Sequence, residues 1–111
     1  MAKFAVLNQN TDFRRLYGRG RSKAHPALVS YAIKNRVGYC RIGITTSKKI
    51  GNAVTRNRAR RVIRAAWQEI LPLVPRGYDI VFVARSRTAG CKSTDLAAVM
   101  RSQLRGLGVL P

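Results

Sequence analysis

The chain has 111 residues, of which 22 are lysine or arginine and only 4 are aspartate or glutamate, so its formal net charge is +18. This length suits one domain with one hydrophobic core, and a hydrophobic content of 46% excludes an intrinsically disordered chain. So large an excess of positive charge repels itself unless a polyanion neutralises it, and nucleic acid is the commonest polyanion in a cell. We therefore expect a nucleic-acid-binding domain whose affinity falls steeply with salt.

The sequence offers little that would place the chain in or across a membrane. No apolar run approaches the roughly 18 residues that a spanning helix needs, and the apolar stretch in Met1 to Asn8 is too short for a signal peptide. We therefore expect a cytoplasmic protein with no membrane partner. Cys40 and Cys91 lack the spacing of a metal site, and we expect two reduced thiols, the first in the core and the second in a loop.

The first elements in chain order are a short helix and two strands. Residues 1–9 are expected to form a flexible tail, followed by a helix from Asp12 to Tyr17 that Gly18 and Gly20 end. Alternating side chains then predict strands at Ala27 to Lys34 and at Tyr39 to Ser47. In the first strand, one face carries Val29, Tyr31 and Ile33.

The longest predicted helix runs from Asn52 to Leu71, with Asn52 as its N-cap and Pro72 blocking its continuation. At about 100° per residue, its apolar side chains gather on one face: Ala59, Val62, Ile63, Ala66 and Ile70. The opposite face carries Asn57, Arg60, Arg61 and Arg64. The helix is therefore amphipathic, with a basic outer face.

A strongly β-type run at Tyr78 to Arg85 and a final helix at Asp95 to Leu104 complete the pattern. The predicted order is therefore α-β-β-α-β-α. This order indicates a single α+β domain over residues 1–111, built on a small, mostly antiparallel central sheet.

The most informative segment is Ser47 to Arg64, SKKIGNAVTRNRARRVIR. From Lys48 to Arg64 it holds seven basic residues and no acid, whereas a solvated helix face normally mixes both signs. Arginine suits phosphate because its planar fork binds two oxygens at once, and a helix N-terminus is itself an anion site. The segment therefore predicts a nucleic-acid-binding helix, against the alternative of a basic face that only meets water.

This segment resembles the signature of the bacterial ribonuclease P protein subunit, which centres on an Arg-Asn-Arg helix, here Arg56-Asn57-Arg58. The opening helix and the three predicted strands are similar to that family as well. The resemblance implies a left-handed crossover through the Arg-rich helix, which pattern reasoning would not give because nearly all such crossovers are right-handed. It also implies a function, which is to help a catalytic RNA remove the 5′ leader of precursor tRNA.

Two RNA-binding surfaces are implied by the resemblance. The surface for the catalytic RNA comprises Lys48, Lys49, Asn52, Arg56, Asn57, Arg58, Arg60, Arg61 and Arg64. The second surface is a cleft between the first helix and the open sheet face, which receives the single-stranded leader and comprises Phe13, Arg14, Tyr17, Val29 and Tyr31. Aromatic side chains suit unpaired bases. The alternative for the apolar members is an ordinary core.

Acidic residues are too few and too scattered to suggest a protein active site. Metal-assisted phosphodiester hydrolysis needs clustered carboxylates, and the lone His25 lies beside Pro26 in a predicted turn. We expect no catalytic residue, metal site or cofactor in the protein itself. The resemblance implies that the RNA subunit holds Mg²⁺ and performs the chemistry. The implied partners are that catalytic RNA and precursor tRNA, without an obligate protein partner.

Two other functions would also explain the charge. A structural ribosomal protein is one, although it gives no reason for an aromatic cleft. A helix-turn-helix DNA binder is the other, but it needs two adjacent helices joined by a short turn, whereas predicted strands flank the long helix.

Overall fold

The computed structural model describes residues 4–7 and 9–111, with the backbone alone for residues 4 and 5. Five strands form one mixed sheet in the order β1-β4-β5-β3-β2. Their bounds are β1 (Phe4–Val6), β2 (Arg21–His25), β3 (Leu28–Lys34), β4 (Cys40–Thr45) and β5 (Tyr78–Ala84). The β1–β4 and β4–β5 pairs are parallel, and the β5–β3 and β3–β2 pairs are antiparallel.

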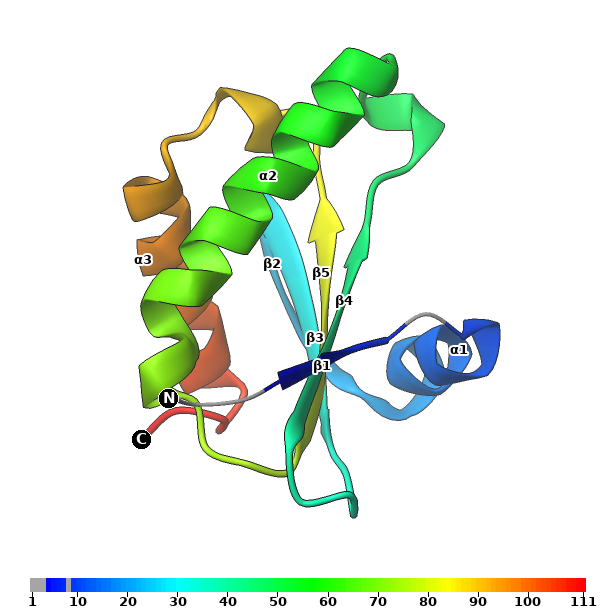
Figure 1. The fold of residues 1–111 in the computed structure, drawn as a ribbon, viewed down its shortest axis with the longest axis vertical. Helices are drawn as coiled ribbons and strands as arrows, with labels where there is room; N and C mark the ends of the chain where they lie inside the picture. The colour runs from blue at the N-terminus through cyan, green and yellow to red at the C-terminus, as the bar shows by residue number, and fades with distance from the viewer. Residues whose placement is uncertain (1–3, 8) are drawn as a thin grey trace.

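Helices cover both faces of this sheet (Figure 1). Helix α1 (Asn10–Arg19) lies alone on one face, and α2 (Ala53–Ile70) and α3 (Ser93–Gly106) pack side by side on the other. The connections on either side of α2 and before α3 contain short 3₁₀ helices: η1 (Lys48–Ile50), η2 (Leu71–Leu73) and η3 (Thr88–Gly90). None of the described helices is long and apolar enough to cross a bilayer.

The main core lies between the sheet and the α2–α3 layer. Strand β3 shows the expected alternation, since Leu28, Ser30 and Ala32 are buried toward that layer. Trp67 of α2 and Phe82 of β5 meet there with ring centroids 5.6 Å apart. On the opposite face, the described residues form a smaller apolar cluster beneath α1, built on Leu7, Leu16 and Val81, and Val29 and Tyr31 of β3 are half-buried there.

The connection from β4 to β5 passes through α2 and joins two parallel neighbours. In Figure 1 both strands run upward, β4 lies nearer the viewer than β5, and α2 lies to their left. The crossover is therefore left-handed, as the resemblance implied. It places the Arg-rich helix and helix α1 on opposite faces of one sheet.

The α+β class is confirmed, and each predicted helix and strand is present within about two residues of its expected ends. The sheet is mixed, since two of the four pairings among the described residues are parallel, but the two antiparallel pairings join more residues, as the sequence predicted. Strand β2 was missed because all five of its side chains are exposed, so the sequence lacks the apolar alternation of a half-buried strand.

The expected flexible tail is also corrected for part of its length. Strand β1 pairs with β4, and Leu7, only 4% exposed, packs in the small cluster beneath α1. Residues 1–3 and 8 of that expectation lie outside the described residues. Three residues of strand are too short to show a period, so the sequence alone could not separate them from a tail.

Candidate nucleic-acid interface

Helix α2 exposes its arginines to solvent because the opposite face of the helix packs in the core. Ala59, Ile63, Ala66 and Ile70 are fully buried, and so is Trp67, which the predicted apolar stripe omitted. Its N-cap is confirmed, since Asn52 Oδ1 accepts a hydrogen bond from the Thr55 amide at 3.0 Å.

The outer face of α2 carries uncompensated positive charge. Asn57, Arg60, Arg61 and Arg64 line one shallow depression together with the exposed Val54. Within the described part of the chain, ion pairs form only at Arg15 and Arg41, so no carboxylate neutralises the arginines of α2.

The remaining predicted residues of this surface lie on η1 and along the first turns of α2. Lys48 and Lys49 are exposed in η1, which leads directly into the N-terminus of α2. Gly51 joins the two helices with φ +145°, and a Cβ atom there would lie 2.9 Å from the Thr55 side chain. Arg56 and Arg58 are two residues apart and so point to roughly opposite flanks of the helix. The surface therefore wraps around the first turns of α2 and narrows to one face farther along.

Aromatic side chains gather between α1 and the sheet. Tyr17 and Tyr31 meet edge to face with centroids 4.9 Å apart, and Phe13 lies 6.4 Å from Tyr17. The Tyr17 hydroxyl is 3.1 Å from Thr45 Oγ1 in a hydrogen bond, and Tyr17 remains 44% exposed. Tyr17 is therefore a surface aromatic rather than core.

The other predicted cleft residues divide between core and surface. Phe13 is half-buried above Gly43, so the ordinary-core alternative holds for part of its ring. Val29 lies two residues before Tyr31 on the same sheet face and is also half-buried, whereas Arg14 is exposed on α1. The structure thus brings three aromatic rings together on the sheet face that carries the half-buried Val29.

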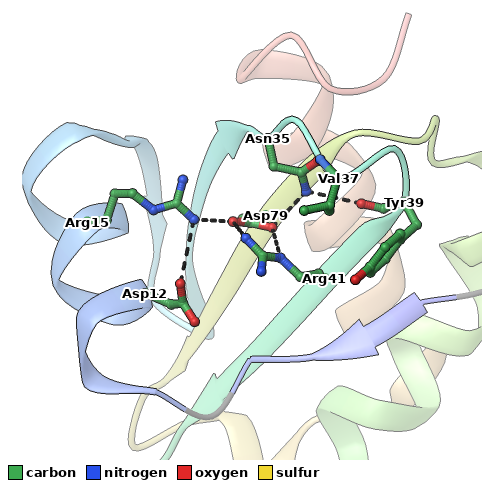
Figure 2. Close-up of polar contacts among 7 residues, drawn as sticks. All are labelled: Asp12, Arg15, Asn35, Val37, Tyr39, Arg41 and Asp79. Carbon is green, nitrogen blue, oxygen red and sulfur yellow. Dashed lines mark hydrogen bonds and ion pairs between the residues drawn. The ribbon is translucent and has the colours of Figure 1, made fainter.

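Sequence reasoning missed the group that anchors α1. The carboxylate of Asp79, whose side chain is fully buried, accepts hydrogen bonds from Arg41 at 2.7 and 2.8 Å and from Asn35 at 2.7 Å (Figure 2). Arg15 of α1 donates a further hydrogen bond to it. An acid within the apolar run YDIVFVA was the available signal, because a buried carboxylate needs cationic partners.

The charge state of Asp79 follows from this environment. Burial raises the pKa of the carboxyl group, but hydrogen bonds from Arg41, Asn35 and Arg15 outweigh burial and hold the pKa below its usual value. In return, the hydrogen bond to Asp79 raises the pKa of Arg41. Asp79 and Arg41 therefore face each other as an ion pair at neutral pH.

Other reactive groups take no part in these surfaces. Cys40 lies in the core as expected, where burial raises the pKa of its thiol to about 12, and Cys91 lies in the loop before α3. Among residues 4–7 and 9–111, no three His, Cys, Asp or Glu side chains come close enough together to hold a metal ion. The helix-turn-helix alternative fails because the chain runs from β4 through α2 to β5.

Comparison with known sequences places this arrangement in a family. A family model described as Ribonuclease P matches residues 1–108. The chain is 47% identical over 92 residues to the ribonuclease P protein component of Clostridioides difficile (strain 630), which covers 80% of this chain and 81% of that relative. It is 36% identical over 104 residues to the ribonuclease P protein component of Clostridium botulinum (strain Loch Maree / Type A3), covering 93% and 94%.

Solved structures agree with these relatives. The RNase P protein of Staphylococcus aureus, at 2.0 Å, superposes with a TM-score of 0.83 and 30% identity, covering 98% of this chain and 100% of that one. The RNase P protein from Thermotoga maritima gives a TM-score of 0.77 and 25% identity, covering 90% and 96%. The left-handed α+β fold is therefore shared with proteins of that name.

Proposed function

The chain belongs to the ribonuclease P protein family, and on that premise we propose that its two RNA surfaces divide the work of removing the 5′ leader from precursor tRNA. The protein is a component of a tRNA-processing endoribonuclease, and its partner is the ribonuclease P RNA. In this proposal the basic face of α2 binds that RNA, and the aromatic cleft beside α1 binds the leader.

The proposal that α2 binds the ribonuclease P RNA rests on the uncompensated positive charge of this helix. Arginines that lack carboxylate partners repel one another, and RNA phosphates would relieve that repulsion. Each phosphate contact also releases counterions, which makes binding salt-dependent. The N-terminus of α2, with Lys48 and Lys49 before it, adds the positive end of a helix dipole.

The proposal that the leader binds beside α1 rests on the cluster of aromatic rings formed by Phe13, Tyr17 and Tyr31. Unpaired nucleotides stack on aromatic side chains largely without regard to sequence. A single-stranded leader has exposed bases, whereas the acceptor stem of a tRNA does not. The cleft would therefore distinguish precursor from mature tRNA, and Arg14 on the same helix would contact the backbone.

We place the chemistry in the RNA subunit. The described acids do not fit a Mg²⁺ site, because Asp79 is enclosed by arginine and asparagine donors and no three ligands converge. Mg²⁺ is therefore proposed to bind through RNA oxygens. The protein would lower the repulsion between two RNAs and hold the leader, without an obligate protein partner.

Cleavage of precursor tRNA at low Mg²⁺ tests the proposal, with three arms: the protein alone, a bacterial ribonuclease P RNA alone, and both together. Low Mg²⁺ matters because the protein's charge then replaces missing counterions. Cleavage only with both supports catalysis by RNA assisted by this chain. Cleavage by repurified protein alone would place an active site in the protein, and no stimulation would refute the proposed assistance.

A further inference from the structure

A small pocket lies beside the basic face of α2, between that helix and the β1–β4 edge of the sheet. Its volume is about 220 Å³, and its apolar walls include Leu7, Ile42, Ile44 and Trp67. Leu7, Ile42 and Trp67 are at most 4% exposed, so these walls belong to packed core. The exposed Val6 borders the same pocket. The pocket is therefore largely preformed.

One side of the pocket is polar and positively charged. Arg60, Arg64 and Gln68 line it, and they succeed one another by one helical turn along α2. Arg60 Nη2 donates to Thr46 Oγ1 at 2.8 Å, which holds that guanidinium in place. Two cations thus flank an apolar recess, and neither has a carboxylate partner within the described chain.

These features select the chemistry of a ligand. The two arginines disfavour a cation, and a volume near that of about seven water molecules at ~30 Å³ each excludes a long acyl chain. A nucleotide matches the apolar walls, the amide of Gln68 and the two arginines of the site. Its base has apolar faces, the base edge can pair with an amide such as that of Gln68, and its phosphates suit guanidinium groups.

We propose that this pocket receives one unstacked nucleobase of the ribonuclease P RNA, with Arg60 and Arg64 on the flanking phosphates and Gln68 at the base edge. The inference rests on the proposed function, in which α2 faces that RNA. It adds a task that phosphate contacts cannot perform. Contacts to phosphate fix the register and orientation of a protein without reading sequence, whereas contacts to a base edge can read the identity of that base.

Trp67 supplies a direct readout, because it lines the pocket and is the only tryptophan in the chain. The probe is a full-length bacterial ribonuclease P RNA, titrated into the intact protein while tryptophan emission is recorded. Dimethyl sulfate reactivity of unpaired bases is measured on the same complexes. We expect the emission to change on binding and at least one unpaired base to become protected.

Two variants alter the pocket in different ways. Ile44→Phe fills the recess, and Gln68→Ala removes the polar group at an exposed position that does not endanger folding. We expect each to weaken RNA binding by roughly fivefold or more and to abolish the base protection. Gln9→Ala, at another exposed glutamine outside the pocket, should leave affinity and protection unchanged.

The outcomes separate this inference from the proposed function. If Arg58→Glu with Arg61→Glu weakens RNA binding but both pocket variants bind and protect like the parent protein, the base pocket is refuted and the α2 interface stands. If the arginine double variant also binds normally, interface and pocket fail together. If precursor tRNA alone changes the emission of Trp67 and the ribonuclease P RNA does not, the pocket serves the substrate and the assignment is overturned.

Discussion

Arg15 on α1 donates a hydrogen bond to the buried carboxylate of Asp79 on β5, across 64 positions of sequence. The same carboxylate binds Arg41 on β4 and Asn35 after β3, so one acid joins a helix to the sheet beneath it (Figure 2). Beyond this network, a small apolar cluster around Leu16 and Val81 holds α1 against the sheet. The position of the cleft aromatics on α1 therefore depends on Asp79.

Asp79 should make the stability of the protein depend on acid pH. Its pKa is lowered in the folded state from an unfolded value near 3.9, so its contribution is complete above about pH 5 and is lost as pH falls through the folded pKa. At pH 7, Asp79→Asn should lower the free energy of unfolding by about 2–3 kcal/mol, less than for fully buried pairs because Arg15 and Arg41 are partly exposed. Urea unfolding between pH 3 and 7 checks this, and a difference that does not shrink toward pH 3 would contradict it.

Removing only the hydrogen bond between Arg15 of α1 and Asp79 should weaken leader binding more than it lowers the stability of the fold. Arg15→Met leaves Asp79 paired with Arg41 but loosens α1, so the aromatic rings lose their fixed distance from the sheet. We expect affinity for leader-bearing tRNA, measured in the holoenzyme, to fall about three- to tenfold. Affinity for mature tRNA and for the RNA subunit should stay constant. Arg19→Met is the matched control on the same helix, and equal losses for both tRNAs would refute the positioning role.

Reversing charge on α2 should weaken binding of the RNA subunit sharply. Arg58→Glu with Arg61→Glu changes the local charge by four units at exposed positions, so phosphate contacts are replaced by repulsion. We expect a loss of more than tenfold at moderate salt and a log-log salt slope reduced by about one for each contact removed. Lys92→Glu, just before α3, with Arg105→Glu, on α3, makes the same charge change away from α2. An equal loss in that control would mean that net charge alone, and not this face, attracts the RNA.

Sequence analysis predicted the elements that have one buried face, because burial of one face makes apolar residues recur at regular intervals in the sequence. Helix α2 shows an apolar stripe because Ala59, Ile63 and Ile70 must face the sheet, and β3 alternates because its two faces meet different surroundings. Strand β2 has no such constraint, since backbone pairing with β3 holds it at the edge while its side chains meet water. Its strand character is a tertiary property.

The candidate sites divide in the same way. The charge of α2 is local in sequence and could be recognised there, whereas the leader cleft is an expectation that came from family resemblance. The Asp79 network depends on residues 15, 35, 41 and 79, which only the folded sheet brings together. The pocket beside Trp67 was not foreseeable, because one of its walls is formed by β1 and the following Leu7, which the sequence did not separate from a tail.

Tyr31 should contribute more to leader binding than to folding. It is half-buried on the sheet face beneath α1 and meets Tyr17 edge to face. Stacking on one base is worth about 1–3 kcal/mol, so Tyr31→Ala should weaken binding of leader-bearing tRNA by roughly five- to a hundredfold and leave mature tRNA nearly unaffected. Tyr39→Ala, at an exposed tyrosine in the turn before β4, is the control. If both tRNAs weaken alike, Tyr31 is not part of a leader site.

Gly43 should be coupled energetically to Phe13. A Cβ atom at Gly43 would lie 2.8 Å from two atoms of the Phe13 ring, so alanine there forces the ring to move. Overpacking costs about 1–3 kcal/mol, against a gain of roughly 0.4–1 kcal/mol from restricting the unfolded chain. Gly43→Ala should therefore destabilise the protein by about 1 kcal/mol.

A double-mutant cycle by urea unfolding isolates the contact between these two residues. In the Phe13→Leu background the ring is gone, so Gly43→Ala should become neutral or stabilising. This leaves a coupling of about 1 kcal/mol or more between the two sites. Displacing the Phe13 ring should also weaken leader binding in the Gly43→Ala protein. Equal destabilisation by Gly43→Ala in both backgrounds would show that the Phe13 ring does not pack against Gly43 of β4. The proposed position of Phe13 in the leader site would then be wrong.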